Sequence, residues 1–298
     1  MTTALDRTRR ALDTPPPDVI PGQLDLTRSA VKPYYEDETV ALYLGDMREV
    51  LPALDLQADL VVADPPYGET SLAWDRWPVG WLETAAAYSS SLWCFGSQRM
   101  FFEHLAEFTA DWSLSQDVIG HDEDGQPIRG DVNVVWEKHN GTGFATDRFK
   151  RVHEHVLHWY RGPWGATHHE APRVPYSGPN KSARGKNSRT SHTGAIGAYS
   201  YTDDGTRLMR SVIKAPSVRG QGRHPDEKPL PILDALIRYG CPPGGLVLDP
   251  FAGSSSTLDA ARRLGIRAIG VEGREDYCEA SARRLSEPYS VGLFDVPA

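Results

Sequence analysis

The chain has 298 residues, 40% of them hydrophobic and 24% charged, a composition that is typical of a globular protein and excludes global disorder. Its net charge of −8 argues, as an average, against a polyanionic partner, so contact with nucleic acid requires a local basic segment. Three widely separated cysteines exclude a disulfide framework. No apolar run reaches membrane-spanning length and no signal-peptide core is present, which predicts a cytoplasmic protein with no membrane partner.

A proline-rich arm with little apolar periodicity opens the chain, and two strands separated by a short helix follow it. The predicted bounds are 1–33 for the arm, 39–44 and 58–63 for the strands, and 47–54 for the helix. The second strand is a continuous apolar run, which is typical of a buried strand in a parallel sheet. Each strand is followed by an acid, Asp46 after the first and Asp64 after the second.

The second strand stops abruptly at Asp64, Pro65, Pro66 and Tyr67. Pro66 cannot donate to a sheet and favours extended backbone at Pro65, so the tetrapeptide is predicted to project as a stiff loop. In open α/β sheets, ligands bind outside the carboxyl ends of the strands. The pattern therefore predicts a site that contains a carboxylate and a phenol.

The segment from 69 to 161 is predicted to complete this half of the sheet. A loop with Trp74 and Asp75 serves either as a lid over the site or as packing. Beyond it we expect helices over 81–90 and 99–108 and strands over 91–96, 132–136 and 152–157, the last two antiparallel. In the second helix, Phe101, Phe102, Leu105 and Phe108 recur at helical spacing and are predicted to lie in the core.

Three histidines in the last of these strands, His153, His155 and His158, resemble a metal cluster. The first two share a face of the strand, but no cysteine or carboxylate accompanies the three at a zinc-like interval. We therefore expect no metal site.

Residues 162–223 form a loop-rich insertion with many basic side chains, including Lys181, Arg184, Lys186 and Arg189. Two interpretations are open. The insertion is either a solvated surface or a surface that contacts phosphates, because cationic side chains release counterions when they bind a nucleic-acid backbone.

Regular structure is predicted to return over 224–290, before a short tail at 291–298. Helices over 230–239, 257–264 and 276–285 and strands over 246–249 and 266–272 are expected, with a right-handed βαβ unit at the centre. Its turn lacks the dinucleotide fingerprint and has Asp249 at the first strand end, where an acid repels pyrophosphate and attracts a cation. Glu272, nineteen residues beyond Gly253, stands where an acid holds ribose hydroxyls. S-adenosylmethionine fits this pattern, although a purely structural turn would use the same residues.

Two motifs together resemble those of the β-class of amino-methylating DNA methyltransferases: Asp64-Pro65-Pro66-Tyr67, and the stretch from Asp249 to Thr257. As in that class, the tetrapeptide precedes the basic insertion and the cofactor motif comes last. The similarity covers about residues 39 to 285 and includes Trp136-Glu137-Lys138 and the segment 224–229. It implies an α/β fold, with a Rossmann-like mixed, mostly parallel sheet flanked by helices and a loop-rich target-recognition insertion.

The resemblance implies a metal-free reaction in which S-adenosylmethionine methylates the amino group of a flipped-out base. Asp64 and the Pro65 carbonyl would accept the amino hydrogens, and Tyr67 would stack on the base. The residues implied to bind the cofactor are Asp46, Lys228, Asp249, Phe251, Gly253, Ser255, Ser256 and Glu272. Ser255 departs from the family, which commonly has glycine there, and this serine either hydrogen-bonds the cofactor or crowds it.

Three further expectations follow from the resemblance. The domain would consist of a catalytic half at 34–161, the target-recognition insertion at 162–223 and a cofactor half at 224–290. Adenine N6 is the expected target because cytosine-N4 members more often carry serine at the place of Asp64; cytosine N4, RNA methylation and an idle DNA-binding module are the alternatives. The expected partner is double-stranded DNA, together with a second copy of the chain and a cognate restriction endonuclease.

Overall fold

The computed structural model describes residues 31–121, 127–131, 133–142, 146–190, 194–218 and 227–290. Most of the expected arm at 1–33, the tail at 291–298 and the start of the segment 224–229 lie outside the described residues.

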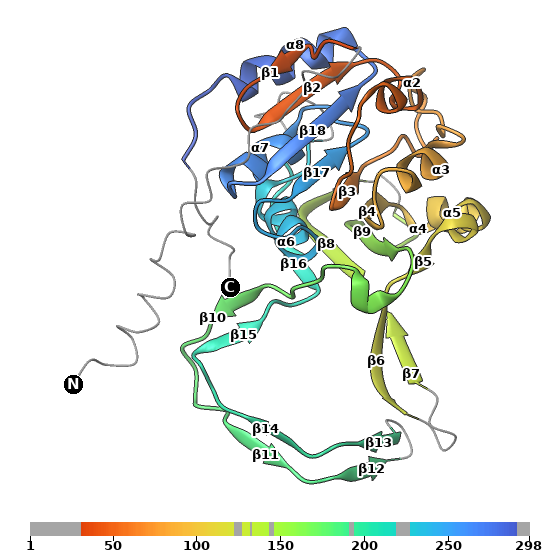
Figure 1. Ribbon diagram of the computed structural model, residues 1–298. Coiled ribbons are helices and arrows are strands. Elements are labelled where there is room, and N and C mark those ends of the chain that lie inside the picture. The colour runs from red at the N-terminus through yellow and green to blue at the C-terminus, as the bar shows by residue number, and fades with distance from the viewer. Residues whose placement is uncertain are drawn as a thin grey trace.

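A ten-stranded sheet forms the centre of the molecule, in the order β1-β2-β18-β17-β3-β4-β9-β8-β16, with β5 paired to β9 (Figure 1). Its strands are β1 (Tyr35–Glu36), β2 (Val40–Leu44), β3 (Leu60–Ala63), β4 (Ser91–Gly96), β5 (Ser113–Leu114), β8 (Asn133–Thr142), β9 (Arg151–Tyr160), β16 (Val212–Lys214), β17 (Leu246–Asp249) and β18 (Arg267–Glu272). The five strands from β2 to β4 are parallel, whereas β9 runs antiparallel to β4 and β8 antiparallel to β9. The mixed, mostly parallel sheet confirms the expected fold class.

The order of the parallel strands creates a switch point between β3 and β17. The chain steps from β3 to β4 in one direction and from β17 to β18 in the other. Leu248 pairs with Val61, and the Asp59 carboxylate accepts a hydrogen bond of 2.8 Å from the Leu246 N–H, 187 residues away. A crevice opens at such a switch point, outside the carboxyl ends of the strands.

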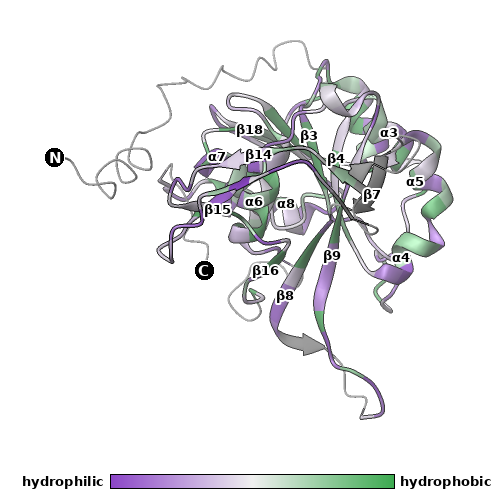
Figure 2. Ribbon diagram, turned by 90° about the horizontal axis from the view of Figure 1, so that it is seen from below, coloured by the Kyte–Doolittle hydropathy of each residue, from purple (hydrophilic) through white to green (hydrophobic). Residues whose placement is uncertain are grey.

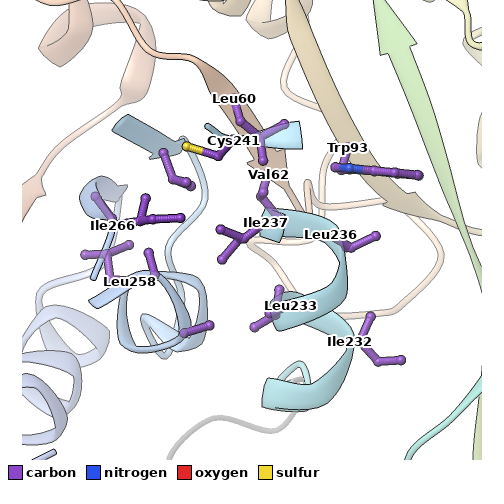
Figure 3. Packing of buried hydrophobic residues seen from close by; sticks show 14 of the residues in the cluster. Leu60, Val62, Trp93, Ile232, Leu233, Leu236, Ile237, Cys241, Leu258 and Ile266 are labelled. Atoms are coloured by element: carbon purple, nitrogen blue, oxygen red, sulfur yellow. The ribbon is translucent and has the colours of Figure 1, made fainter. Parts of the chain in front are cut away.

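Helices cover both faces of the sheet, because alternate residues of each buried strand point to opposite sides. One face carries α2 (Met47–Val50), α3 (Trp81–Ala86), α4 (Gln98–Glu103) and α5 (Leu105–Asp111), and the other carries α6 (Leu230–Gly240), α7 (Ser256–Arg263) and α8 (Glu275–Leu285). Leu60 and Val62 of β3 pack with Leu233 and Ile237 of α6 (Figure 3). Val61 and Ala63 belong to the opposite cluster. Among the described residues, no helix is long and apolar enough to cross a bilayer.

The helix predicted over 99–108 is two helices, α4 and α5, separated at His104 (φ −108°, ψ 13°). The His104 ring stacks on Trp77 at 3.8 Å between centroids, which holds the chain at the break. Phe101 and Phe108 are buried, but Phe102 of α4 and Leu105 of α5 are 69% and 45% exposed, so the prediction that these two lie in the core is wrong.

The expected loop-rich insertion contains short strands that form a long two-stranded arm (Figure 1). They are β10 (Arg173–Pro175), β11 (Ala183–Gly185), β12 (Ser188–Thr190), β13 (Gly194–Ile196), β14 (Tyr199–Tyr201) and β15 (Thr206–Leu208). They pair as β10–β15, β11–β14 and β12–β13, and β13 also pairs with β6 (Gln116–His121) of the hairpin that β7 (Pro127–Asp131) completes. The chain rejoins the central sheet at β16, before the expected end of the insertion at 223.

Candidate active site

The structure brings the four predicted strand-end acids to one edge of the sheet. Asp64 follows β3, Asp249 ends β17, Glu272 ends β18 and Asp46 follows β2. Because these strands are adjacent and parallel, their carboxyl ends lie in a row beside the switch point. The two sequence motifs, far apart in the chain, therefore meet in space.

Both carboxylate oxygens of Asp64 have partners. The Tyr67 hydroxyl donates to Oδ1 at 2.6 Å, and Lys228 Nζ lies 2.6 Å from Oδ2. Lys228 was expected to bind the cofactor, but its ammonium contacts the Asp64 carboxylate of the tetrapeptide. Only 9% of the Lys228 side chain is exposed, against 27% of Asp64.

Two charged residues that sequence reasoning missed complete this group. Glu154 of β9 accepts a hydrogen bond of 3.0 Å from the Tyr67 hydroxyl and lies 3.6 Å from Lys228 Nζ. Lys138 of β8 lies 2.8 Å from the other Glu154 oxygen. The order Asp64, Lys228, Glu154, Lys138 alternates in sign, which compensates charges that are shielded from water. We call these four residues with Tyr67 the charge cluster.

Aromatic rings and burial set the electrostatics of the cluster. Lys228 Nζ lies 5.1 Å from the Phe95 ring centroid, and Lys138 Nζ lies 4.5 Å from that of Trp136. Burial opposes ionisation of Glu154, but Lys228 and Lys138 outweigh it and lower its pKa to about 2. Burial, followed by the charge of Asp64, raises the pKa of Tyr67, so its hydroxyl stays protonated and can donate.

The loop after the tetrapeptide is anchored by Asp75. This buried carboxylate accepts hydrogen bonds from the main-chain N–H groups of Gly68 (2.8 Å) and Thr70 (2.6 Å). Although burial opposes ionisation, a hydrogen bond from the Thr70 side chain and these main-chain hydrogen bonds lower the pKa of Asp75. Trp77 stacks on His104 and donates to Glu107 at 2.9 Å. Of the two interpretations of this loop, the structure supports packing for Trp77.

The turn after β17 is built around two buried acids. Asp249, 4% exposed, accepts a hydrogen bond of 3.0 Å from the Phe251 N–H, and burial raises its pKa to about 7. The Glu272 carboxylate accepts one hydrogen bond of 2.8 Å on each oxygen, from the N–H groups of Gly253 and Arg274. A buried acid of raised pKa gains from a cationic partner, and an oriented carboxylate can accept from a diol, so these residues fit a cationic nucleoside.

Ser255 adopts the left-handed conformation at φ 54° and ψ 31°, and it is the one non-glycine residue with positive φ in the described part of the chain. The residue has 0% exposure, and its hydroxyl has no hydrogen-bond partner. Ser256, the first residue of α7, is 5% exposed. Both serines therefore shape the turn from inside and offer a ligand almost no surface.

Asp46 caps α2 by accepting from the Arg48 N–H at 2.9 Å. The Arg48 guanidinium contacts both Asp46 oxygens, at 2.9 and 2.5 Å, and lowers the pKa of the carboxyl. Asp46, which was expected to bind the cofactor, is thus bonded to Arg48 of the following helix in this structure.

The histidines of β9 do not form a metal centre. The rings of His153 and His155 lie 5.1 Å apart, while His158 is buried and contacts the Ser91 hydroxyl through Nε2 at 3.0 Å. Within the part of the chain that the structure describes, no group of three His, Cys, Asp or Glu side chains could hold a metal ion.

The basic residues of the arm fall into two kinds. Arg207 stacks 3.9 Å from the Tyr176 ring centroid and pairs with Asp203 at 2.6 Å, so it holds the arm together. Lys181, Arg184 and Lys186 are exposed, and Arg189 lies in β12, although its side chain is outside the described residues. Figure 2 shows the hydrophilic colour on the arm near β15 and along β9 as it extends away from the other strands.

Comparison with solved structures shows the same fold. The chain is similar to the M1.HpyAVI–SAM complex, with a TM-score of 0.52 and 20% identity over 82% of this chain and 99% of that one. It is also similar to the cytosine-N4-specific PvuII DNA methyltransferase, with a TM-score of 0.56 and 16% identity over 87% and 90% of the two chains.

Sequence comparison identifies relatives along most of the chain. Type II methyltransferase M.ScaI of Streptomyces caespitosus is 27% identical over 282 residues, which cover 88% of this chain and 86% of the relative. Type II methyltransferase M2.DpnII of Streptococcus pneumoniae is 24% identical over 280 residues, or 85% and 92% of the two chains. The model of the N6/N4-type DNA methylase family matches residues 58–283, from the strand before the tetrapeptide to the last helix. The chain therefore belongs to the N6/N4 family of DNA methylases, whose members methylate an exocyclic amino group of a DNA base.

Proposed function

We propose that the protein transfers a methyl group from S-adenosylmethionine to adenine N6 at a specific site in double-stranded DNA, as a member of the β-class. The observation that carries the proposal is the pairing of β3 with β17, which sets Asp64 and the Asp249 turn side by side. The amino-group acceptor and the cationic cofactor would then meet at one crevice.

The chain's own residues would prepare the amino group for attack. Its lone pair is delocalised into the base, and acceptors for both amino hydrogens favour the pyramidal nitrogen. The Asp64 carboxylate and the Pro65 carbonyl supply these acceptors, Pro66 stiffens the loop, and Tyr67 offers a ring for stacking. The cofactor, when bound, supplies the electrophilic methyl group.

Burial and hydrogen bonding support the roles that we propose for the cofactor-binding residues. Asp249 would pair with the cofactor ammonium, beside Phe251 and Gly253, and Glu272 would accept from the ribose hydroxyls. Asp46 would accept from the amino group of the cofactor's adenine, and for this it would need to release Arg48. That the similar M1.HpyAVI was solved with SAM supports this assignment.

The arm within residues 162–223 would contact DNA through Lys181, Arg184 and Lys186, because exposed cations on an extended arm can reach phosphates. Arg189 of β12 is the fourth cation that the sequence assigns to this surface. The Type II methyltransferase relatives support site-specific action. A homodimer, a cognate restriction endonuclease and a cytoplasmic location stay predictions of the family resemblance.

The test is methylation of unmodified genomic DNA by the purified full chain with isotope-labelled S-adenosylmethionine, followed by nucleoside digestion and mass spectrometry. We expect 6-methyladenine, and we expect Asp64→Ala to lower its rate at least about 100-fold. Glu103→Gln, at an exposed pair with Arg99, is the control that keeps full activity. Labelled 4-methylcytosine without 6-methyladenine would make cytosine N4 the target, and transfer that survives Asp64→Ala would contradict the mechanism.

A further inference from the structure

The charge cluster leaves Asp64 no free carboxylate oxygen. Tyr67 donates to Oδ1 and Lys228 contacts Oδ2, both at 2.6 Å. A base whose amino hydrogen is to reach this carboxylate must therefore share or displace one of these partners. Of the two, Lys228 has a second carboxylate within reach.

Glu154 is the alternative partner of Lys228. Its Oε1 lies 3.6 Å from Lys228 Nζ, so a shift of about an ångström would replace the contact with Asp64 by a contact with Glu154. A buried ammonium is costly without a carboxylate nearby, and aromatic ring faces alone, such as that of Phe95, do not compensate it fully. The exchange keeps the ammonium paired throughout.

Glu154 itself is held in place from two sides. Lys138 contacts Oε2 at 2.8 Å, and β9 fixes the backbone because Glu154 pairs with Trp136 of β8. The Tyr67 hydroxyl has one hydrogen to share between Asp64 and Glu154, so it can keep a bond to Glu154 while Asp64 accepts from the base. The ring that would stack on the base is thereby oriented in both states.

We propose that Glu154 is a positioning residue for methyl transfer, which takes over Lys228 and orients Tyr67 when the amino group of the target base occupies Asp64. The inference rests on the proposed function but holds equally for adenine and cytosine. In this account Lys228 acts beside Asp64, where the target amino group binds, and Lys138 holds Glu154 in place.

The proposal has a pH signature. The charged and titratable groups that face Asp64 and Glu154 are Tyr67, Cys94, Lys138, His155, Lys228 and Asp249. Burial and then the Glu154 charge raise the pKa of Asp64, while Lys228 lowers it. Without that negative charge, and with Lys228 left on Asp64, the pKa of Asp64 falls. The acid limb of the rate profile, where activity is lost as Asp64 takes a proton, then moves to lower pH.

The experiment compares the full-length wild type, Glu154→Gln, Lys228→Met and the double variant in single-turnover methylation of DNA across pH. We expect Glu154→Gln to lower the rate of methyl transfer at about pH 7.5 by about 10- to 100-fold. It should also shift the acid limb of the rate profile to lower pH. The affinity for S-adenosylmethionine should change by less than about threefold. In the Lys228→Met background, Glu154→Gln should add little, because glutamine can still accept from Tyr67 and the interaction it loses is the ion pair with Lys228. Glu137→Gln on the adjacent strand, at an exposed pair with Lys214, is the matched control and should match the wild type.

Each outcome decides between the proposals. A wild type that methylates DNA while Glu154→Gln keeps the wild-type rate overturns this inference alone. If Glu154→Gln lowers the rate but leaves the acid limb in place, and its effect adds to that of Lys228→Met, Glu154 has a merely structural role. That result also overturns the inference. A wild type that binds S-adenosylmethionine but transfers no methyl group to any base contradicts the proposed function, and the inference with it.

Discussion

At the scale of single residues, Ser255 holds a backbone conformation that suits glycine. A side chain in the left-handed region costs roughly 1–2 kcal/mol, and a buried hydroxyl without a partner costs about 1–3 kcal/mol more. The structure thus gives a physical reason for the glycine that the family commonly has here. Ser255 has no exposed surface, so its side chain does not crowd the cofactor. Its cost lies in the stability of the turn.

We predict that Ser255→Gly raises the free energy of unfolding by about 1–2 kcal/mol, after the larger backbone entropy of glycine in the unfolded chain is subtracted. Urea denaturation with and without S-adenosylmethionine measures it. Ser255→Ala removes the hydroxyl and keeps the strain, so it should gain about half as much. An alanine variant as stable as the glycine variant would show that the backbone conformation is not the cause.

At the scale of elements, a buried ion network joins α7 and α8 beneath the turn after β17. Asp259 contacts Arg262 at 3.0 Å and Arg284 at 3.1 Å, and Arg284 also contacts Glu227 at 2.6 Å. Glu227 directly precedes Lys228, so the network links the last helix to the segment that reaches the charge cluster. Arg262 is 1% exposed and Asp259 3%.

We predict that Asp259→Ala destabilises the fold by about 3–5 kcal/mol, because it leaves a buried guanidinium without its carboxylate. Thermal or urea unfolding checks this. Glu279→Gln in α8 removes an exposed i,i+4 pair with Arg283 and should change stability by less than about 0.5 kcal/mol. Equal losses in the two variants would contradict the account.

Elements with a strong local signal were predictable, and those without one were not. The strands before Asp64 and Asp249 are continuous apolar runs that end in an acid and a proline, so their positions follow from the chain alone. At the break, His104 stacks on Trp77, a contact with a preceding loop that the periodicity of residues 99–108 does not reveal. The arm's three-residue strands have no apolar alternation that could reveal them.

The same distinction applies to the candidate site. Asp64, Asp249 and Glu272 were predicted because each stands at the carboxyl end of a strand, and parallel pairing then brings them together. Glu154 carries no such signal, since it stands between two histidines in a strand of ordinary composition. Its importance arises only when β9, β8 and the segment before α6 converge on the tetrapeptide. The sequence did contain one clue, the Trp136-Glu137-Lys138 segment.

At the scale of the whole molecule, an acidic protein carries exposed cations on an arm that leaves the sheet (Figure 1). We predict that replacing Lys181, Arg184 and Lys186 by alanine weakens DNA binding about equally for all sequences. The slope of log affinity against log salt should fall by up to about 3, because each of the three side chains can neutralise one phosphate. Fluorescence anisotropy between about 50 and about 200 mM salt measures it.

The matched control for the arm is Arg283→Ala, an exposed cation on α8 that pairs with Glu279. It should leave the salt slope unchanged. An unchanged slope in the triple alanine variant would show that these side chains do not contact phosphates. The arm would then be a solvated surface, the alternative that its composition also allows.

The pairing of β3 with β17 also has a consequence for how the protein is made. Asp59 and its partner Leu246 are 187 residues apart, so a ribosome adding about 5–20 residues per second completes the second strand roughly 10–40 s after the first. During that interval β4 can cover one side of β3, while the other side stays an open apolar edge on the nascent chain. Any transcript cut short before β17 would release a polypeptide whose tetrapeptide follows a strand with one unpaired, aggregation-prone edge.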